Sequence, residues 1–219
     1  MIYSHIIKRR RMSDRDGSES SSDSCTIEST EEVSVTRSDT PGPGPGPGPG
    51  PGPGAVDVLI EIPFGSNMKY EFDKDVGVLR CDRVLHTPHA YPFNYGYFPD
   101  TLAGDGDDLD AVVATKYPLV VPSIIRCRII GALLTHDEKG DDEKIICVPA
   151  DSVDPEFHGI TSLDDLSNSE VDKIKYFFRH YKRKEPNKFV KVRGFVGREE
   201  AERLYLEARD RRASTGSEM

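Results

Sequence analysis

The sequence predicts a mainly β domain of the α+β class, in which helices pack outside a compact β-barrel and a disordered tail comes first. Three observations predict this fold. Short β-rich stretches follow one another from residue 56 without alternating helices, which favours a barrel over a doubly wound sheet. Helical patterns occur only after residue 166, and the first 54 of the 219 residues differ in composition from the rest. About 160 residues remain, which is an ordinary size for one domain.

The N-terminal region is expected to be unpacked. Residues 1–40 are predicted to be a disordered Ser/acid-rich tail, because they contain too few apolar side chains to offset the entropy of ordering. Residues 41–54 repeat Pro-Gly and are predicted to be a linker. The tail is interpreted as a spacer, with a phosphorylation target as the alternative, and the chain could also start at Met12. The folded domain is placed at residues 55–210, and a disordered C-terminus at residues 211–219.

The strands are predicted by alternation and by Val and Ile content. A turn is expected at residues 74–77, and the polar, Gly-containing stretch HDEKGDDE at residues 136–143 is typical of a hairpin loop. The predicted strands cover residues 56–63, 67–73, 77–85, 110–115, 123–135 and 144–150.

Two helices follow the strands. The first is predicted at residues 167–181, where Ser167 and Glu170 have the spacing of a capping box. The second is predicted at residues 198–212, with acids early and arginines late as the helix dipole favours. Their apolar faces consist of Val171, Ile174, Phe178 and Tyr181, and of Ala201, Leu204, Tyr205 and Ala208.

Charge and cysteine content exclude several classes of protein. The formal net charge of -9 and the pI near 5.2 argue against a nucleic-acid binder. The four cysteines show no C-x-x-C pairing, and Cys127 and Cys147 lie in apolar runs, so we expect buried free thiols in a reducing compartment. No apolar run approaches the ~20 residues that cross a bilayer, and the first residues do not resemble a secretory signal. We therefore expect a cytoplasmic protein that binds neither membrane nor nucleic acid.

The stretch GDGDDLDAVV, residues 104–113, is the strongest candidate for a metal site. In a strand Asp105 and Asp107 would share a face that Asp110 does not, so the chain must bend if all three are to converge. The glycines at 104 and 106 make that bend inexpensive. An EF-hand is excluded by its required Gly and Glu positions, and an all-oxygen site suits Mg²⁺ or Mn²⁺. The alternative is a solvated acidic loop.

Other segments supply complementary groups. The hairpin loop adds acids, and Glu61 is a charged residue among apolar neighbours that needs a partner. Carboxylates that hold divalent metals, beside Lys, Arg and Tyr donors that hold an anion, are what phosphoryl chemistry needs. The additional acids are Asp137, Asp141, Asp142 and Glu71, and the candidate donors are Lys69, Arg83, Lys144, Tyr181 and Lys182.

The stretch HAYPFNYGYFPDTL, residues 89–102, is dense in Tyr and Phe. Core packing with a polar tip reaching outward is one interpretation. Phenol donors lining an anion pocket are the other, with Tyr95 as the best candidate. A base-stacking platform is disfavoured by the acids that follow.

Six motifs in order resemble the soluble family I inorganic pyrophosphatases, particularly the short bacterial type. They are IEIP, KYE, CDR, YPFNYGYFPDTLAGDGDDLD, DEKGDDEK and HYK, and the resemblance covers residues 56–208. It implies a five-stranded OB-like β-barrel with flanking C-terminal helices, which hydrolyses pyrophosphate to two orthophosphates with Mg²⁺, and Mn²⁺ is a possible substitute. Short bacterial relatives form hexamers, so a homo-oligomer is expected.

The resemblance also implies a role for each matching position. Asp105, Asp110 and Asp142 hold the activating metals, and Asp107 is the general base. Asp137, Glu61 and Glu71 are further acids that hold or screen a metal. Lys69, Tyr181 and Lys182 hold the leaving phosphate, Arg83 and Tyr95 hold the other phosphoryl group, and Lys144 is a further substrate-side group.

One position departs from the family pattern. After the second signature aspartate, where the family usually has Pro and sometimes Glu, this chain has Asp108. Its charge could face solvent or strengthen a metal site, and we expect it to face solvent. Two competing functions stay open: a catalytically weak paralogue with a binding or assembly role, and a metal-binding barrel acting on a different phosphate compound. All matching positions are filled, which favours an active enzyme.

Overall fold

The structure is a computed structural model of the chain and describes residues 54–216. The expectations for the tail, residues 1–40, and for the linker up to residue 53 lie outside the described residues. The strands are β1 (Ala55–Ile62), β2 (Met68–Asp73), β3 (Val78–Val84), β4 (Asn94–Tyr97), β5 (Asp110–Val113), β6 (Ser123–Asp137), β7 (Gly140–Asp141), β8 (Lys144–Pro149) and β9 (Val190–Gly197). The helices are α1 (Asn168–His180) and α2 (Arg198–Gly216), with short 3-10 helices at Pro155–Phe157 and Leu163–Asp165.

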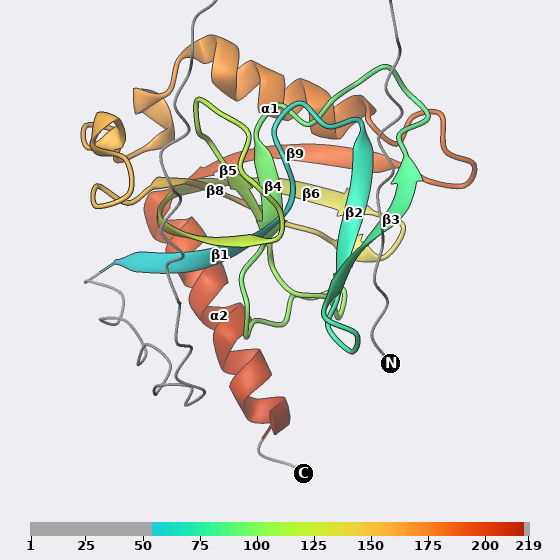
Figure 1. Ribbon diagram of the computed structural model, residues 1–219, viewed down its shortest axis with the longest axis horizontal. Coiled ribbons are helices and arrows are strands. Elements are labelled where there is room, and N and C mark those ends of the chain that lie inside the picture. The colour runs from blue at the N-terminus through green and yellow to red at the C-terminus, as the bar shows by residue number, and fades with distance from the viewer. Residues whose placement is uncertain (1–53, 217–219) are drawn as a thin grey trace, which may run out of the picture. The chain divides into compact units, whose positions relative to one another are not determined.

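Five strands close into a ring, which confirms the predicted barrel. The hydrogen-bonded order is β1, β4, β5, β8 and β6, and β6 pairs back with β1 to complete the ring. All of these pairings are antiparallel except that of β5 with β8. The long strand β6 also pairs with β7 and β9. Figure 1 shows the ring seen from one side, with α1 along its upper edge and α2 running away from it below.

The core follows from the alternation in the strands. In β1 every second side chain is buried, so Val58, Ile60 and Ile62 point inward and are fully buried. Between β1 and β4 the backbones approach so closely that a Cβ on Gly96 would lie 1.8 Å from the Leu59 carbonyl oxygen. Only glycine fits at this crossing, and the approach brings Tyr95 of β4 against the cavity described below.

Each helix covers one part of the core. The capping box of α1 is formed as predicted: the Ser167 hydroxyl accepts from the Glu170 N–H at 3.3 Å, and the Glu170 carboxylate accepts from the Ser167 N–H at 2.9 Å. Buried side chains of α1, among them Ile174 and Phe178, join the core cluster that includes Tyr95. The small residues of α2 pack against the other cluster.

The strands β2 and β3 form a separate two-stranded sheet, which stands beside the ring in Figure 1. The predicted turn joins them at residues 74–77. A carboxylate oxygen of Glu61, in β1, accepts a hydrogen bond from the Phe72 N–H of β2. Because an isolated hairpin is marginally stable in water, such ties to the ring matter for any side chain that this hairpin carries.

Three features differ from the sequence prediction. The strands β4 and β9 were not predicted, and α2 continues to Gly216. The expectation of a disordered C-terminus is therefore wrong for residues 211–216. There the Arg211 Nε donates to the Leu102 carbonyl at 2.8 Å, and the Ser214 hydroxyl donates to the Asp210 carbonyl one turn earlier. No helix within residues 54–216 is long and apolar enough to cross a membrane.

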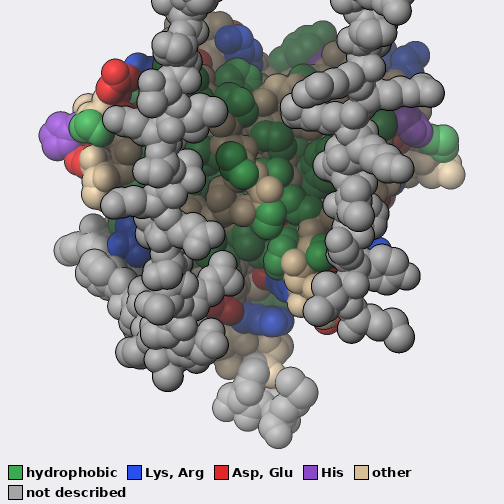
Figure 2. Space-filling view, viewed as in Figure 1, with side chains coloured by type: hydrophobic (Ala, Val, Ile, Leu, Met, Phe, Trp, Pro, Cys, Tyr) green, Lys and Arg blue, Asp and Glu red, His purple; other side chains and the backbone are tan. Residues whose placement is uncertain are grey.

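Figure 2 shows hydrophobic side chains gathered in the middle of one face, with charged side chains towards its edges. Exposed apolar side chains occur in the segment before β6 and at its start, where Tyr117, Val120 and Ile124 are 72%, 84% and 63% exposed. Exposed apolar side chains mark contact surfaces where they form a contiguous patch.

Candidate active site

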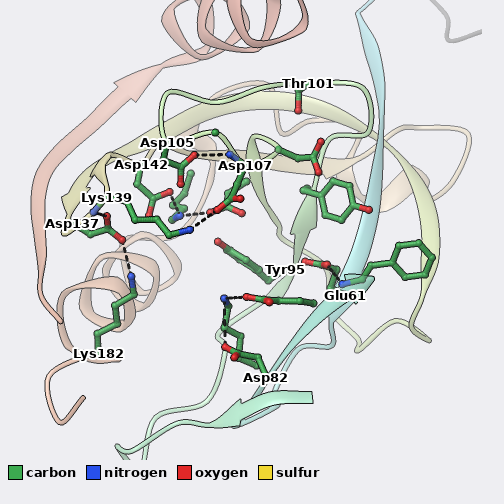
Figure 3. A pocket seen from close by; sticks show the side chains of 18 of the residues that line it. Glu61, Asp82, Tyr95, Thr101, Asp105, Asp107, Asp137, Lys139, Asp142 and Lys182 are labelled. Carbon is green, nitrogen blue, oxygen red and sulfur yellow. Dashed lines mark hydrogen bonds and ion pairs between the residues drawn. The ribbon is translucent and has the colours of Figure 1, made fainter. Parts of the chain in front are cut away.

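A cavity of about 580 Å³ opens between the ring, the β2–β3 hairpin and the end of α1. All but one of the site residues predicted from the sequence line it, although they come from segments far apart in the chain. The exception is Asp141, which is paired with His136 and Arg193 instead. The predicted residues that line the cavity are Glu61, Lys69, Glu71, Arg83, Tyr95, Asp105, Asp107, Asp110, Asp137, Asp142, Lys144, Tyr181 and Lys182. Figure 3 shows Asp105, Asp107 and Asp142 on one side of the opening, and Glu61 and Asp82 on the other, with Tyr95 between them.

The loop that carries Asp105 and Asp107 bends as its sequence predicted. Gly106 adopts φ +92, in the region that favours glycine, whereas Gly104 does not have a positive φ. The loop is closed by a hydrogen bond from the Ala103 N–H to the Asp107 carbonyl at 2.8 Å. The Asp105 carboxylate accepts from the Asp107 N–H at 3.2 Å. The bend thus brings three aspartates of this stretch to one cavity.

The parallel pairing of β5 with β8 places Asp110 directly opposite Lys144. The Lys144 ammonium is bonded to the carboxylates of both Asp110 and Asp142, and its side chain is only 3% exposed. Burial opposes its charged form, yet the two carboxylates raise the pKa of Lys144 above its usual value. Lys144 therefore lies between two predicted metal ligands, and its ammonium is 5.9 Å from the centroid of the Tyr95 ring.

Two further predicted acids are paired with lysines. The Lys182 ammonium lies 2.7 Å from an Asp137 carboxylate oxygen, and Lys139 lies 2.7 Å from Asp107. Burial opposes the charged form of Asp137, but the hydrogen bonds from Lys182 and from the Lys139 N–H hold its pKa below the usual value. The Asp107 side chain itself is exposed, so it is accessible to a water molecule in the cavity.

Glu61 lies on the opposite side of the opening (Figure 3). Burial, with a smaller contribution from the nearby Asp110 charge, raises its pKa to about 7, although the hydrogen bond from the Phe72 N–H opposes this rise. Next to it, Lys69 is bonded to Glu71 and lies 3.7 Å from Asp82. This part of the cavity therefore holds three carboxyl groups, those of Glu61, Glu71 and Asp82, with Lys69 beside the last two.

The anion side of the cavity is built from buried phenols and one guanidinium. The phenols of Tyr91, Tyr95 and Tyr181 are buried, and burial raises the pKa of each well above its usual value. They are therefore protonated near neutral pH and can donate hydrogen bonds. Arg83 is bonded to the neighbouring Asp82, and its Nε lies 3.0 Å from a carboxylate oxygen of Glu185.

Several residues of the site were not predicted from the sequence. Glu185, whose side chain is 3% exposed, follows α1 and faces Arg83. Its carboxylate also lies 3.7 Å from the Lys188 ammonium. Glu185 does not itself line the cavity, whereas Lys188, Lys139 and Tyr91 do. A buried acid in the otherwise basic stretch RHYKRKEPNK is the one signal that could have indicated Glu185.

The expectation that Asp108 faces solvent is wrong. Its side chain is 14% exposed, and its carboxylate is bonded to the Lys74 ammonium at the turn of the β2–β3 hairpin. The physical reason is that the hairpin reaches across the acidic loop and covers Asp108 with a cation. This residue has a structural partner in the cavity wall.

The donor set fits a divalent metal. Carboxylates outnumber cationic side chains among the residues that line the cavity, and carboxylate oxygens are the ligands that Mg²⁺ prefers. Within residues 54–216 no three acidic, His or Cys side chains are already arranged as a metal site. Asp107, Asp110, Asp137 and Asp142 are instead paired with lysine ammonium groups. In these ion pairs a lysine ammonium group supplies the positive charge that the carboxylates face in the cavity.

Comparison with known proteins gives one consistent result. A sequence profile described as inorganic pyrophosphatase matches residues 58–213. A curated inorganic pyrophosphatase of Gluconobacter oxydans is 52% identical over 153 residues, covering 70% of this chain and 88% of the relative. One from Sulfolobus acidocaldarius is 51% identical over 146 residues, covering 67% of this chain and 84% of the relative.

Solved structures agree with the sequence comparisons. The inorganic pyrophosphatase of Helicobacter pylori matches with a TM-score of 0.71 and 44% identity, covering 73% of this chain and 94% of that chain. The inorganic pyrophosphatase of Thermus thermophilus matches with a TM-score of 0.70 and 39% identity, covering 74% and 92%. The predicted OB-like barrel is confirmed by these neighbours.

Proposed function

The chain belongs to the inorganic pyrophosphatase family of diphosphatase enzymes, and we propose that it hydrolyses inorganic pyrophosphate to two orthophosphates with Mg²⁺ as cofactor. Mn²⁺ is a possible substitute, since both ions accept all-oxygen sites. The observation that carries the proposal is that one cavity combines metal-type carboxylates with Lys, Arg and Tyr donors for an anion. That combination suits an anhydride that carries several negative charges.

The carboxylates would hold the metal. Asp105, Asp110 and Asp142 are the proposed main ligands, and they line one side of the cavity. Asp137, Glu61 and Glu71 are proposed to hold or screen a further ion. Bound Mg²⁺ would neutralise phosphoryl oxygens and lower the pKa of a coordinated water from ~15.7 towards ~7. Lys144 would keep the charge of Asp110 and Asp142 balanced until the ion arrives.

The proposed reaction is an in-line hydrolysis. Asp107, exposed to the cavity, takes a proton from a water while the water oxygen forms a bond to one phosphorus. The bridging P–O bond breaks, and the bridging oxygen leaves with the second orthophosphate. A positioned general base contributes about 10²–10⁴-fold to such a step.

The donors on the anion side would hold both phosphoryl groups. Lys69, Tyr181 and Lys182 are proposed to bind the leaving phosphate, and Arg83 and Tyr95 the phosphoryl group under attack. The buried phenols support this assignment, because they are protonated donors in a region from which water is largely excluded. Fixed donors of this kind stabilise developing negative charge without reorganising.

We further propose a cytoplasmic enzyme whose catalytic domain is residues 55–210, with residues 1–40 as a tail and residues 41–54 as a linker. The profile match over residues 58–213 supports this domain. A homo-oligomer, with a hexamer favoured, is supported by the exposed apolar side chains before β6 and at its start. Neither nucleic acid nor membrane is proposed as a partner, which agrees with the negative net charge.

The test is phosphate release from pyrophosphate by the full-length protein, with and without Mg²⁺. We expect release only with Mg²⁺ and a loss of about 10³-fold in kcat for Asp107→Ala. Asp172→Ala is the matched control, since Asp172 is an exposed aspartate of α1 that does not line the cavity. Absence of Mg²⁺-dependent release would overturn the proposed function, and undiminished release by Asp107→Ala would overturn the role of that residue.

A further inference from the structure

The β2–β3 hairpin carries catalytic groups but lies outside the closed ring. Lys69 and Arg83, which lie opposite each other in its register, are two of the proposed anion donors. The proposed main metal ligands, Asp105, Asp110 and Asp142, lie on the ring and its loops. The distance between donors and metal ligands therefore depends on how the hairpin is held against the ring.

Two ties hold the hairpin along its length. Glu61 of the ring accepts a hydrogen bond from the Phe72 N–H in β2. At the other end, Arg83 in β3 faces the buried Glu185, which follows α1. The Phe72 tie lies next to the turn at residues 74–77, whereas the Arg83 tie lies at the opposite end of the hairpin. Neither tie includes a residue of the turn itself.

The turn is held by a third contact. The Lys74 ammonium is bonded to the Asp108 carboxylate and lies 5.0 Å from the centroid of the Tyr97 ring. Lys74 is half exposed, whereas Asp108 is largely covered. The ammonium is therefore placed between a carboxylate and an aromatic face, and both attract a cation.

The partner of Lys74 is itself firmly placed. Leu109, the next residue, is buried, and its N–H donates to the Thr101 hydroxyl at 2.9 Å. The Leu109 carbonyl accepts from the Phe98 N–H at 2.9 Å, which continues the pairing of β4 with β5. Asp108 therefore extends from a fixed point of the ring, next to the proposed base Asp107.

We propose that Lys74 and Asp108 form a clasp that positions the β2–β3 hairpin, so that Lys69 and Arg83 face the metal ligands across the cavity. The proposal rests on the proposed function for its effect on catalysis. Both members are positioning residues, since neither is proposed to touch the substrate or the metal.

The clasp predicts a coupled effect on substrate binding. In the full-length protein, Lys74→Met and Asp108→Asn are each expected to raise KM for Mg-pyrophosphate about threefold, as suits an ion pair near the surface. We expect kcat to change less than about twofold, because the metal ligands and the base stay in place. The double variant is expected to be no worse than either single variant, since both changes remove the same contact.

Charge reversal and a distant pair provide controls. The exchanged pair, Lys74→Asp with Asp108→Lys, is expected to restore KM to within about twofold of the parent protein, since it rebuilds the contact. Lys116→Met is the matched control, because Lys116 is paired with Glu156 on the surface and does not line the cavity. Additive effects of the two single changes would overturn the clasp.

Two further readouts distinguish a clasp from a metal-binding role of Asp108. Calorimetric titration of the substrate-free protein with Mg²⁺ is expected to give the same dissociation constant for all variants. Weaker Mg²⁺ binding by Asp108→Asn alone would show a metal ligand and overturn the clasp. Amide hydrogen exchange over residues 68–84 is expected to speed up equally in both single variants. This readout does not depend on activity, so it tests the clasp even if pyrophosphate is not hydrolysed, and unchanged exchange would also overturn it.

Discussion

The two walls of the cavity are held in different ways. The acidic wall, Asp105, Asp107, Asp110 and Asp142, is carried by the closed ring and its short loops, where strand pairing fixes the backbone on both sides. The hairpin wall, Lys69, Glu71 and Arg83, is carried by a separate two-stranded sheet that a few side chains tie to the ring. We therefore expect binding of the main metal ion by Asp105, Asp110 and Asp142 to be a property of the ring, whereas substrate affinity depends on how the hairpin is placed.

The largest effect is expected from the acidic wall. Asp110→Asn removes a carboxylate that Lys144 and the proposed metal share, so kcat should fall about 10³-fold, as for other losses of a charge-stabilising group. Steady-state phosphate release checks this. A change confined to KM would break the proposed division between the walls.

The next effect concerns the hairpin wall. Arg83→Met keeps most of the side-chain volume and removes the guanidinium, which is expected to raise KM about 30-fold, the size of a lost charge-assisted hydrogen bond. The same kinetic measurement gives KM and kcat separately. If kcat fell and KM did not, Arg83 would act in the transition state alone.

A stability effect follows from Glu61. Its pKa of about 7 in the metal-free fold lies above the ordinary 4.5, so the folded state holds the proton more tightly than the unfolded state. Its contribution to stability is present below pH 4.5 and is lost as the pH rises through 7. At pH 8 and without metal, Glu61→Gln should therefore raise the free energy of unfolding by about 1–2 kcal/mol.

Urea unfolding at pH 8 and at pH 4 checks the Glu61 prediction. The difference between Glu61→Gln and the parent protein should be close to zero at the lower pH. Added Mg²⁺ should stabilise the parent more than the variant, because Glu61 is a proposed ligand. Equal stability of the two proteins at pH 8 without metal would contradict the prediction.

A smaller effect than that of Arg83→Met is expected from Glu185, which forms an ion pair with Arg83 without facing the substrate. Glu185→Gln should raise KM about fivefold, with kcat nearly unchanged, since the charge of the pair is lost while the guanidinium stays in the site. Glu156→Gln, at an exposed ion pair, is the control. An effect as large as that of Arg83→Met would show that Glu185 does more than orient this side chain.

Most strands could be predicted from the sequence because one face of each is buried. The strand β1 shows the alternation fully, with Val58, Ile60 and Ile62 inside. In β4 all four residues are buried, so the period of two disappears. The alternation in β9 is readable but weak, because its side chains are half-buried or exposed and its pairing partner β6 is distant in sequence.

The residues of the site likewise include some that could be predicted from the sequence and some that could not. Its acids and donors could be identified by residue type and by the family motifs, and the cavity brings together all of them except Asp141. The partners of these residues could not be identified from the sequence. The Lys74–Asp108 and Arg83–Glu185 contacts join segments that only the folded chain places side by side. The solvent-facing interpretation of Asp108 was wrong for this reason.

The contrast between the two walls can be measured by calorimetric titration with Mg²⁺ in the absence of pyrophosphate. Asp110→Asn, in the acidic wall, is expected to weaken Mg²⁺ binding at least about tenfold, as for loss of about 1.4 kcal/mol. Arg83→Met, in the hairpin wall, is expected to leave the dissociation constant within about twofold of the parent protein. Equal weakening by both variants would contradict a main metal site that is carried by the ring.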